Sequence, residues 1–153
     1  MKSTKKKLAI VTGAARGIGL ATAKLFSQND YKVAIVDRDK NELSNLSFTN
    51  NFMKSFCYDI SDFNEVDIMY QEILEWHNRI DVLVNNAGVA DFGKIEMTDF
   101  KRWNEVMKTN LDGAFICSQK AINHLKTTKG SIINIASISG LRASTLRIAY
   151  GTS

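Results

Sequence analysis

The chain has 153 residues, of which 44% are hydrophobic and 24% carry a charge, so its composition is that of a globular domain and excludes a disordered or fibrous chain. The formal net charge of +4 equals the charge of the four lysines within residues 1–7. Because the remainder is neutral, we expect no basic surface and no nucleic-acid partner. The expected organisation is a basic N-terminal tail over residues 1–7 and one domain over residues 8–153.

Nothing in the sequence predicts export, a membrane span or a metal site. The apolar stretch after residues 1–7 runs into a glycine-rich segment, unlike a signal peptide, and no apolar run approaches the roughly 18 residues of a membrane-spanning helix. Cys57 and Cys117 lie 60 positions apart, and we expect them to be buried free thiols of a cytoplasmic protein. His77 and His124 have no partner at ligand spacing, so we expect surface or boundary histidines and no metal.

Apolar runs and helical patterns alternate along the chain. In chain order, we expect a strand over 7–13, a helix over 18–30, a strand over 31–37, a polar helix or loop over 39–51, a strand over 52–60, a helix over 63–79, a strand over 80–88, a helix over 99–127 and a strand over 130–137. This alternation predicts an α/β fold, in which five strands form a doubly wound parallel sheet with helices on both faces. Ligands of such folds bind at the carboxyl ends of the strands.

The spacing of apolar side chains also predicts which face of a helix is buried. In the first helix the apolar positions at helical spacing are Ile18, Ala21, Leu25 and Phe26, and in the helix over 63–79 they are Val66, Met69, Ile73 and Trp76. Ser61 and Asp62 offer an N-cap for the second of these helices.

The segment TGAARGIG, Thr12–Gly19, joins the first strand to the first helix. Its glycines allow a tight turn and a close approach of the backbone to a pyrophosphate, which the unpaired N–H groups of a helix N-terminus would bind. Asp37 ends the second strand, where a carboxylate can accept hydrogen bonds from both ribose hydroxyls of an adenosine and would repel a 2′-phosphate. Arg16 and Arg38 could instead pair with that phosphate. The sequence therefore favours NAD over NADP as the cofactor.

The glycine spacing GxxxGxG, introduced by Thr12, resembles the short-chain dehydrogenase/reductase family, and in particular its 3-oxoacyl-carrier-protein reductase type. NNAG at 85–88, Asp59–Ile60, and an Asn, a Ser and a Tyr at family positions extend the resemblance over nearly the whole chain. It implies a Rossmann-type fold. The implied cofactor-binding residues are Thr12, Gly13, Arg16, Gly17, Ile18, Gly19, Asp37, Asp59, Ile60, Asn86, Ala87 and Gly88, and the implied catalytic residues are Asn110, Ser137 and Tyr150.

The same resemblance implies an NAD(P)-dependent oxidoreductase that transfers a hydride between nicotinamide and a small-molecule secondary alcohol or ketone. Tyr150 would move the proton, Ser137 would polarise the substrate carbonyl, and Asn110 would hold a water in the proton path. Because a free phenol is almost wholly protonated at neutral pH, the family also uses a lysine four positions after its tyrosine.

That lysine would stand one position beyond Ser153. We therefore expect the chain to be the N-terminal, cofactor-binding portion of such an enzyme, to lack the C-terminal part of the family fold, and to be impaired or inactive by itself. The alternatives are a non-catalytic dinucleotide-binding module and a gene remnant. We further expect the strand over 130–137 to lie at a sheet edge. The complete protein is expected to be a homo-oligomer, a dimer or tetramer, with the helix over 99–127 in an interface.

Overall fold

The computed structural model describes residues 5–48, 51–142 and 145–153. Its strands are β1 (Leu8–Thr12), β2 (Lys32–Asp37), β3 (Met53–Cys57), β4 (Val82–Asn85) and β5 (Ser131–Asn134). Its helices are α1 (Gly17–Gln28), α2 (Lys40–Ser44), α3 (Phe63–Trp76), α4 (Phe100–Met107), α5 (Gly113–Thr128) and α6 (Ile148–Thr152), with 3₁₀ turns η1 (Ile95–Met97) and η3 (Ile138–Gly140) and a π-helical turn η2 (Lys108–Asp112). The five predicted strands are all present, each shorter than the apolar run that predicted it.

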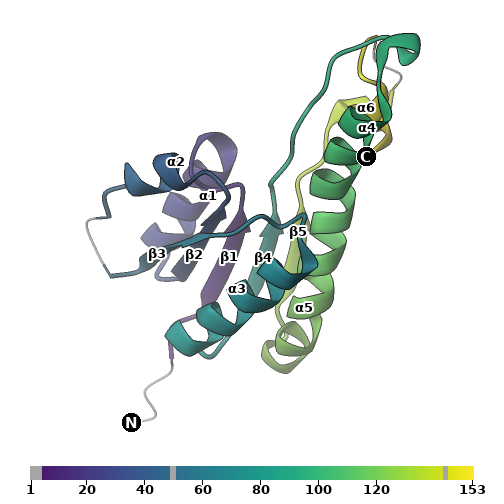
Figure 1. Ribbon diagram of the computed structural model, residues 1–153. Helices are drawn as coiled ribbons and strands as arrows, with labels where there is room; N and C mark the ends of the chain where they lie inside the picture. Colours follow the sequence, from purple (N-terminus) through teal and green to yellow (C-terminus); the bar gives the residue numbers. More distant parts are fainter. Residues whose placement is uncertain (1–4, 49–50, 143–144) are drawn as a thin grey trace.

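The strands form one parallel sheet in the order β3-β2-β1-β4-β5 (Figure 1). The chain runs outward from the central strand β1 to β3, then returns to the other side of β1 to add β4 and β5. This order confirms the predicted doubly wound sheet, and β5 lies at an edge of the sheet as predicted. The order reverses between β1 and β4, the point at which such sheets bind ligands.

Side chains of the central strand β1 alternate between two apolar layers. Leu8 and Ile10 pack in one layer with residues of α3 and α5, while Ala9 and Val11 pack in the other with residues of α1 and α2. The two pairs of helices lie on opposite faces of the sheet (Figure 1). All four side chains are fully buried. Because both faces are covered, the strand reads as a continuous apolar run rather than as an alternating pattern.

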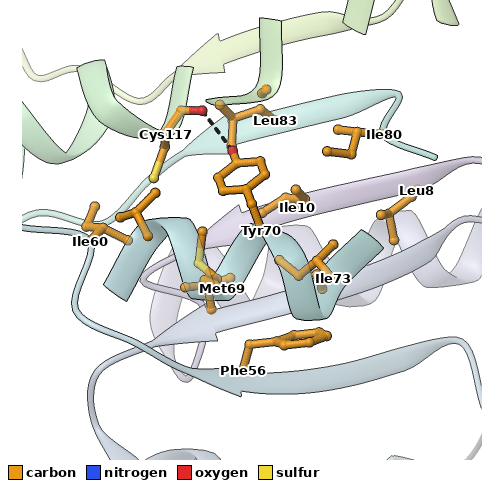
Figure 2. Packing of buried hydrophobic residues seen from close by; sticks show 14 of the residues in the cluster. Leu8, Ile10, Phe56, Ile60, Met69, Tyr70, Ile73, Ile80, Leu83 and Cys117 are labelled. Carbon is orange, nitrogen blue, oxygen red and sulfur yellow. Dashed lines mark hydrogen bonds between the residues drawn. The ribbon is translucent and has the colours of Figure 1, made fainter. Parts of the chain in front are cut away.

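The layer under α3 is drawn in Figure 2. Met69 and Ile73 are fully buried in it, and the hydroxyl of Tyr70 donates a hydrogen bond of 2.8 Å to the carbonyl of Cys117 on α5. Burial raises the pKa of the Tyr70 phenol well above its ordinary value and that of the Cys117 thiol to about 12. Both groups therefore stay protonated and serve packing. The predicted buried face of this helix is confirmed, and its N-cap is Asp62.

The predicted apolar face of α1 is only partly buried: Phe26 packs against the core, whereas Ala21 is exposed. Ile18 and Leu25 are 67% and 61% exposed, and the buried side of the helix consists of Gly19, Ala23 and Ser27. These small side chains let the helix backbone approach the sheet closely. A Cβ on Gly19 would meet the amide of Asn86 at 2.5 Å, so apolar spacing identified the helix but the requirement for small residues decided its orientation.

The single helix predicted over 99–127 is interrupted. α4 and α5 are joined by the π-helical turn η2, which carries Asn110 near its centre. Single π-turns inside helices occur frequently at functional sites, because the extra residue shifts the side chains that follow. None of the helices in the described part of the chain combines the length and apolar character that a bilayer crossing requires.

Two single-residue predictions are also wrong. Cys57 is exposed, because it is the last residue of an edge strand, whereas Cys117 is buried as predicted; both are free thiols. His77 is buried, and its Nε2 lies 2.7 Å from the carbonyl oxygen of Lys6. The Lys6 ammonium pairs with Asp30 at 2.9 Å, so contacts with the domain begin before β1.

We predict that His77 makes the protein sensitive to acid. Burial and the charges of Lys5 and Lys32 lower its pKa, against a smaller opposing effect of the Lys6 carbonyl and of Asp81. Below the ordinary pKa of histidine, near 6.5, the unfolded chain therefore binds more protons than the folded one, and the free energy of unfolding falls as the pH decreases.

Urea denaturation at pH 7 and pH 5 tests this. His77→Gln should lose less stability over the interval than the unsubstituted protein, because glutamine does not titrate. His124→Gln is the matched control and should show the same loss as the unsubstituted protein. An identical loss in His77→Gln and the unsubstituted protein would contradict the assignment.

Candidate functional site

The glycine-rich segment between β1 and α1 forms a turn at the carboxyl end of the central strand. Gly13 and Gly17 have φ values of 61° and 56°, in the left-handed region where glycine is favoured. Arg16 is the N-cap residue of α1 and makes no side-chain capping bond. The first N–H groups of this 12-residue helix therefore face the strand ends with the partial positive charge of a helix N-terminus.

Thr12 and Asn86 fasten this turn to the end of β4. The Thr12 hydroxyl accepts hydrogen bonds from the backbone N–H groups of Asn86 and Ala87, each 3.1 Å long, and donates to the Val84 carbonyl at 3.3 Å. In return, the Asn86 side-chain amide donates to the carbonyls of Thr12 and Gly13 at 2.9 and 3.0 Å. These bonds bring the turn against the segment after β4.

The contact is close enough to exclude a side chain at Gly13. A Cβ there would lie 2.6 Å from Cα of Ala87, a separation that real Cβ atoms do not show. Asn85, the last residue of β4, ties this strand to its other neighbours: its amide donates to Ser118 on α5 at 3.0 Å and to Asn134 on β5 at 2.8 Å. The NNAG segment therefore braces the carboxyl ends of three strands.

Asp37 lies at the end of β2 with both carboxylate oxygens held by backbone amides. Its Oδ2 accepts from the N–H of Ala15 and its Oδ1 from the N–H of Asp39, both at 3.1 Å. The carboxylate is thus fixed beside the glycine-rich turn by the chain on each side of it. Each oxygen keeps a further lone pair for a ligand.

A cavity of about 420 Å³ lies over these strand ends. All the predicted cofactor-binding residues except Thr12 and Gly17 line it: Gly13, Arg16, Ile18, Gly19, Asp37, Asp59, Ile60, Asn86, Ala87 and Gly88. Thr12 is fully buried and acts through the bonds described above, and Gly17 supplies the second left-handed turn. The structure therefore brings the predicted residues together around one hollow.

The cavity also has walls that sequence reasoning missed. They include Tyr58 and Thr109. Burial and the neighbouring Glu72 raise the pKa of the Tyr58 phenol to about 12, so it is a neutral wall. Tyr58 and Thr109 are next in sequence to the predicted site residues Asp59 and Asn110. This adjacency was the sequence signal that could have identified them.

Asn110, Ser137 and Tyr150 come from three segments that meet. The Asn110 amide donates to the hydroxyl of Ser153 at 2.9 Å, and that hydroxyl donates to the Tyr150 carbonyl at 3.1 Å. The hydroxyl of Ser137 accepts from the N–H of Ser139 at 3.2 Å and begins the turn η3.

The turn η3 packs on α6, which carries Tyr150. A Cβ on Gly151 would lie 3.2 Å from the carbonyl oxygen of Ser139, so the two backbones approach closely there. Ser137 and Tyr150 both remain partly exposed. Among the residues that the structure describes, no three His, Cys, Asp or Glu side chains gather into a metal-binding group.

Asn110 also fixes the start of the loop that follows β4. Its side chain accepts from the N–H of Val89 at 2.8 Å and donates to the carbonyl of Val89 at 2.9 Å. Arg102 on α4 holds the same loop through Asp91, at 2.6 Å. The loop and α6 rise together beyond the strand ends, at the top of Figure 1, and the backbones of Gly93 and Arg147 form a bridge there.

Residues 7–153 match the family model described as short chain dehydrogenase. The chain belongs to this family. The matched range includes the glycine-rich turn, the NNAG segment and the residues Asn110, Ser137 and Tyr150.

Named relatives of the chain differ in their activities. The chain is 37% identical over 137 residues to a meso-2,3-butanediol dehydrogenase of Serratia marcescens, covering 88% of this chain and 55% of that protein. It is 36% identical over 146 residues to a 3-oxoacyl-(acyl-carrier-protein) reductase of Staphylococcus aureus, covering 92% and 58%. The chain spans about half to two thirds of the length of the curated relatives it matches.

A solved structure of a relative has the same architecture. The 3-ketoacyl-(acyl-carrier-protein) reductase of Brucella melitensis, complexed with NADH, superposes with a TM-score of 0.90 at 28% sequence identity. The superposition covers 97% of this chain and 64% of that chain. The Rossmann-type fold predicted from the sequence is therefore confirmed.

We predict that Thr12 is needed for stability through its hydroxyl. Thr12→Val keeps the side-chain shape but leaves the half-buried N–H groups of Asn86 and Ala87 without this acceptor, at a cost of about 1 kcal/mol or more for each. Urea denaturation should show this loss in Thr12→Val. Thr12→Ser retains the hydroxyl and should be more stable than Thr12→Val. Equal stability of the two variants would show that these hydrogen bonds contribute nothing.

Proposed function

We propose that this polypeptide is an NAD-linked oxidoreductase that acts on a secondary alcohol or ketone. The observation that carries the proposal is the cavity at the strand ends, which combines the glycine-rich turn, the N-terminus of α1 and the fixed carboxylate of Asp37. When bound, the nicotinamide would supply or accept the hydride. The NADH complex of the Brucella melitensis relative supports this assignment.

The residues present fit a dinucleotide. The close approach at Gly13 and Gly19 leaves backbone rather than side chains beside the turn, where a pyrophosphate would bind to N–H groups. Asp37, already held by Ala15 and Asp39, would accept hydrogen bonds from the adenosine ribose hydroxyls. A carboxylate at that place disfavours a 2′-phosphate, which supports NAD over NADP.

We assign the catalytic roles to Asn110, Ser137 and Tyr150, which come from three segments that meet. Tyr150 would transfer the proton to or from the substrate oxygen, and Ser137 would donate a hydrogen bond that orients the substrate and polarises its carbonyl. Asn110, through its bonds to Val89 and Ser153, would hold the segments of this cluster in place beside the proposed water path. The differing activities of the relatives leave the substrate class at secondary alcohol or ketone.

A second candidate is a dinucleotide-binding module without turnover. It is favoured by one observation: the residues that line the cavity include none of Asn110, Ser137 and Tyr150. Turnover and nucleotide binding can be measured separately, and the experiments below measure each.

We also propose a homo-oligomer and a cytoplasmic location. Leu111 of η2 and Phe115 and Ile122 of α5 are exposed, while Cys117 and Ala121 of α5 are buried. An exposed apolar stripe of this kind is typical of a subunit interface. The two free thiols, Cys57 and Cys117, support a reducing compartment.

We predict that the protein binds NADH and that Asp37 sets its preference over NADPH. Asp37→Asn keeps an acceptor for Ala15 but removes the charge, so the ratio Kd(NADPH)/Kd(NADH) should fall by about tenfold or more. Fluorescence titration measures both constants. Asp30→Asn is the control, because Asp30 precedes β2 at the opposite ends of the strands. An unchanged ratio in Asp37→Asn would contradict the role of Asp37.

We predict that Tyr150→Phe abolishes turnover and leaves nucleotide binding intact. Loss of the proton donor should lower kcat for ketone reduction by about 10²–10⁴-fold. NADH oxidation over a ketone panel is the measurement. Tyr31→Phe, before β2, is the control and should keep the activity of the unsubstituted protein. A folded polypeptide that binds NADH but oxidises it only at background rate would favour the second candidate.

A further inference from the structure

Arg38 and Asp59 form an ion pair at the adenosine end of the candidate cavity. They follow β2 and β3, respectively, and Nη1 of Arg38 lies 3.3 Å from Oδ2 of Asp59. Both residues line the 420 Å³ cavity and also two neighbouring hollows. The pair therefore lies between the candidate cavity and the two neighbouring hollows, and one side of it faces the proposed nucleotide.

Asp59 is anchored independently of Arg38. Its Oδ1 accepts from the N–H and the hydroxyl of Ser61, at 2.9 and 2.8 Å, and its own N–H donates to Glu65 of α3 at 2.7 Å. The carboxylate is thus fixed at the start of α3, while Arg38 is a long side chain that is 55% exposed. In this pair Asp59 is the fixed partner and Arg38 the movable one.

The charge of Asp59 persists at neutral pH. Burial alone would raise the pKa of its carboxyl, but the hydrogen bonds from Ser61 and the guanidinium of Arg38 outweigh burial and lower the pKa below its ordinary value. The second arginine of the cavity has a carboxylate neighbour as well, since Arg16 lies 3.7 Å from Glu42. The two cations that could bind a 2′-phosphate are both ion-paired.

We propose that Asp59 is a positioning residue for cofactor choice, which holds the Arg38 guanidinium away from the ribose 2′ position. This inference rests on the proposed function and adds a second determinant to Asp37. Asp37 would act directly on the ribose, whereas Asp59 acts through Arg38. An exposed ion pair is weak, so it contributes little to stability. For the same reason, a phosphate could take Arg38 once Asp59 no longer holds it.

The test compares two ligands that contain only the adenosine end, 5′-AMP and 2′,5′-ADP, by calorimetric titration. In Asp59→Asn the ratio Kd(2′,5′-ADP)/Kd(5′-AMP) should fall by about three- to tenfold, because the released guanidinium can bind the added phosphate. Asp59→Glu, which restores a carboxylate, should recover the original ratio. Asp30→Asn, which also removes one surface carboxylate from an ion pair, should leave the ratio unchanged.

The double variant Asp59→Asn/Arg38→Leu separates Asp59's own charge from its action through Arg38. The fall in the ratio should disappear in this variant. If the double variant shows the same fall as Asp59→Asn, Asp59 acts by direct repulsion and the proposal is wrong. The proposal is also wrong if Asp59→Asn folds and binds 5′-AMP but its ratio Kd(2′,5′-ADP)/Kd(5′-AMP) equals that of the unsubstituted protein.

A further variant keeps the proposal testable if Asp59→Asn does not fold. Arg38→Leu alone should leave the ratio within about twofold of the original, since the held guanidinium does not contact the 2′ position. A selective loss of 2′,5′-ADP binding in Arg38→Leu would overturn the proposal. If the folded, unsubstituted protein binds neither ligand, the proposed function itself fails, and the inference fails with it.

Discussion

The site depends on the attachment of the glycine-rich turn to the end of β4. The Thr12 hydroxyl pairs with two backbone amides after β4, and the Asn86 amide pairs with two carbonyls of the turn. These bonds join the ends of β1 and β4, the two strands between which the strand order reverses. They also bring Gly13 so near Ala87 that no side chain fits between them. The geometry of the cavity follows from this junction, because the turn directs the N-terminus of α1 toward the strand ends.

Charged side chains line the other end of the cavity, where we propose that the adenosine binds. Asp37 is fixed by two backbone amides, and Asp59 is fixed by Ser61 and pairs with Arg38. We propose that these fixed carboxylates and paired guanidiniums favour ribose hydroxyls over an added phosphate. The family membership of the chain indicates a nicotinamide dinucleotide, and the charges of these residues are the basis for choosing between its two forms. The proposed substrate side is built from different segments, which meet through Asn110 and Ser153.

Much of this could be predicted from the sequence, because both faces of the sheet are covered. Buried parallel strands appear as continuous apolar runs, so the sequence predicted the five strands and the doubly wound parallel sheet. The glycine-rich turn and Asp37 were predicted from the chemistry of a pyrophosphate and a ribose. Asp59, Ile60 and the residues 86–88 were implied only by the family resemblance. Tyr58 and Thr109 carry no such signal and were missed.

The errors have a common physical origin in tertiary packing. α1 turns its small residues, including Gly19 and Ala23, toward the sheet and leaves Leu25 exposed, because close backbone approach outweighs apolar burial there. The helical period of 99–127 could not reveal the π-turn at Asn110, whose side chain is tied to Val89. The burial of His77 depends on Lys6, which is distant in sequence. Local patterns report which elements form, whereas these details depend on contacts between elements.

The most direct test of the account is a crystal structure of the protein with NADH. We expect density for the pyrophosphate against the backbone between Gly13 and Gly19. We also expect density for the adenosine ribose, with its hydroxyls hydrogen-bonded to the carboxylate of Asp37. A dinucleotide bound elsewhere on the molecule would contradict the account. So would a folded protein whose crystals, grown with saturating NADH, show the cavity filled by solvent alone.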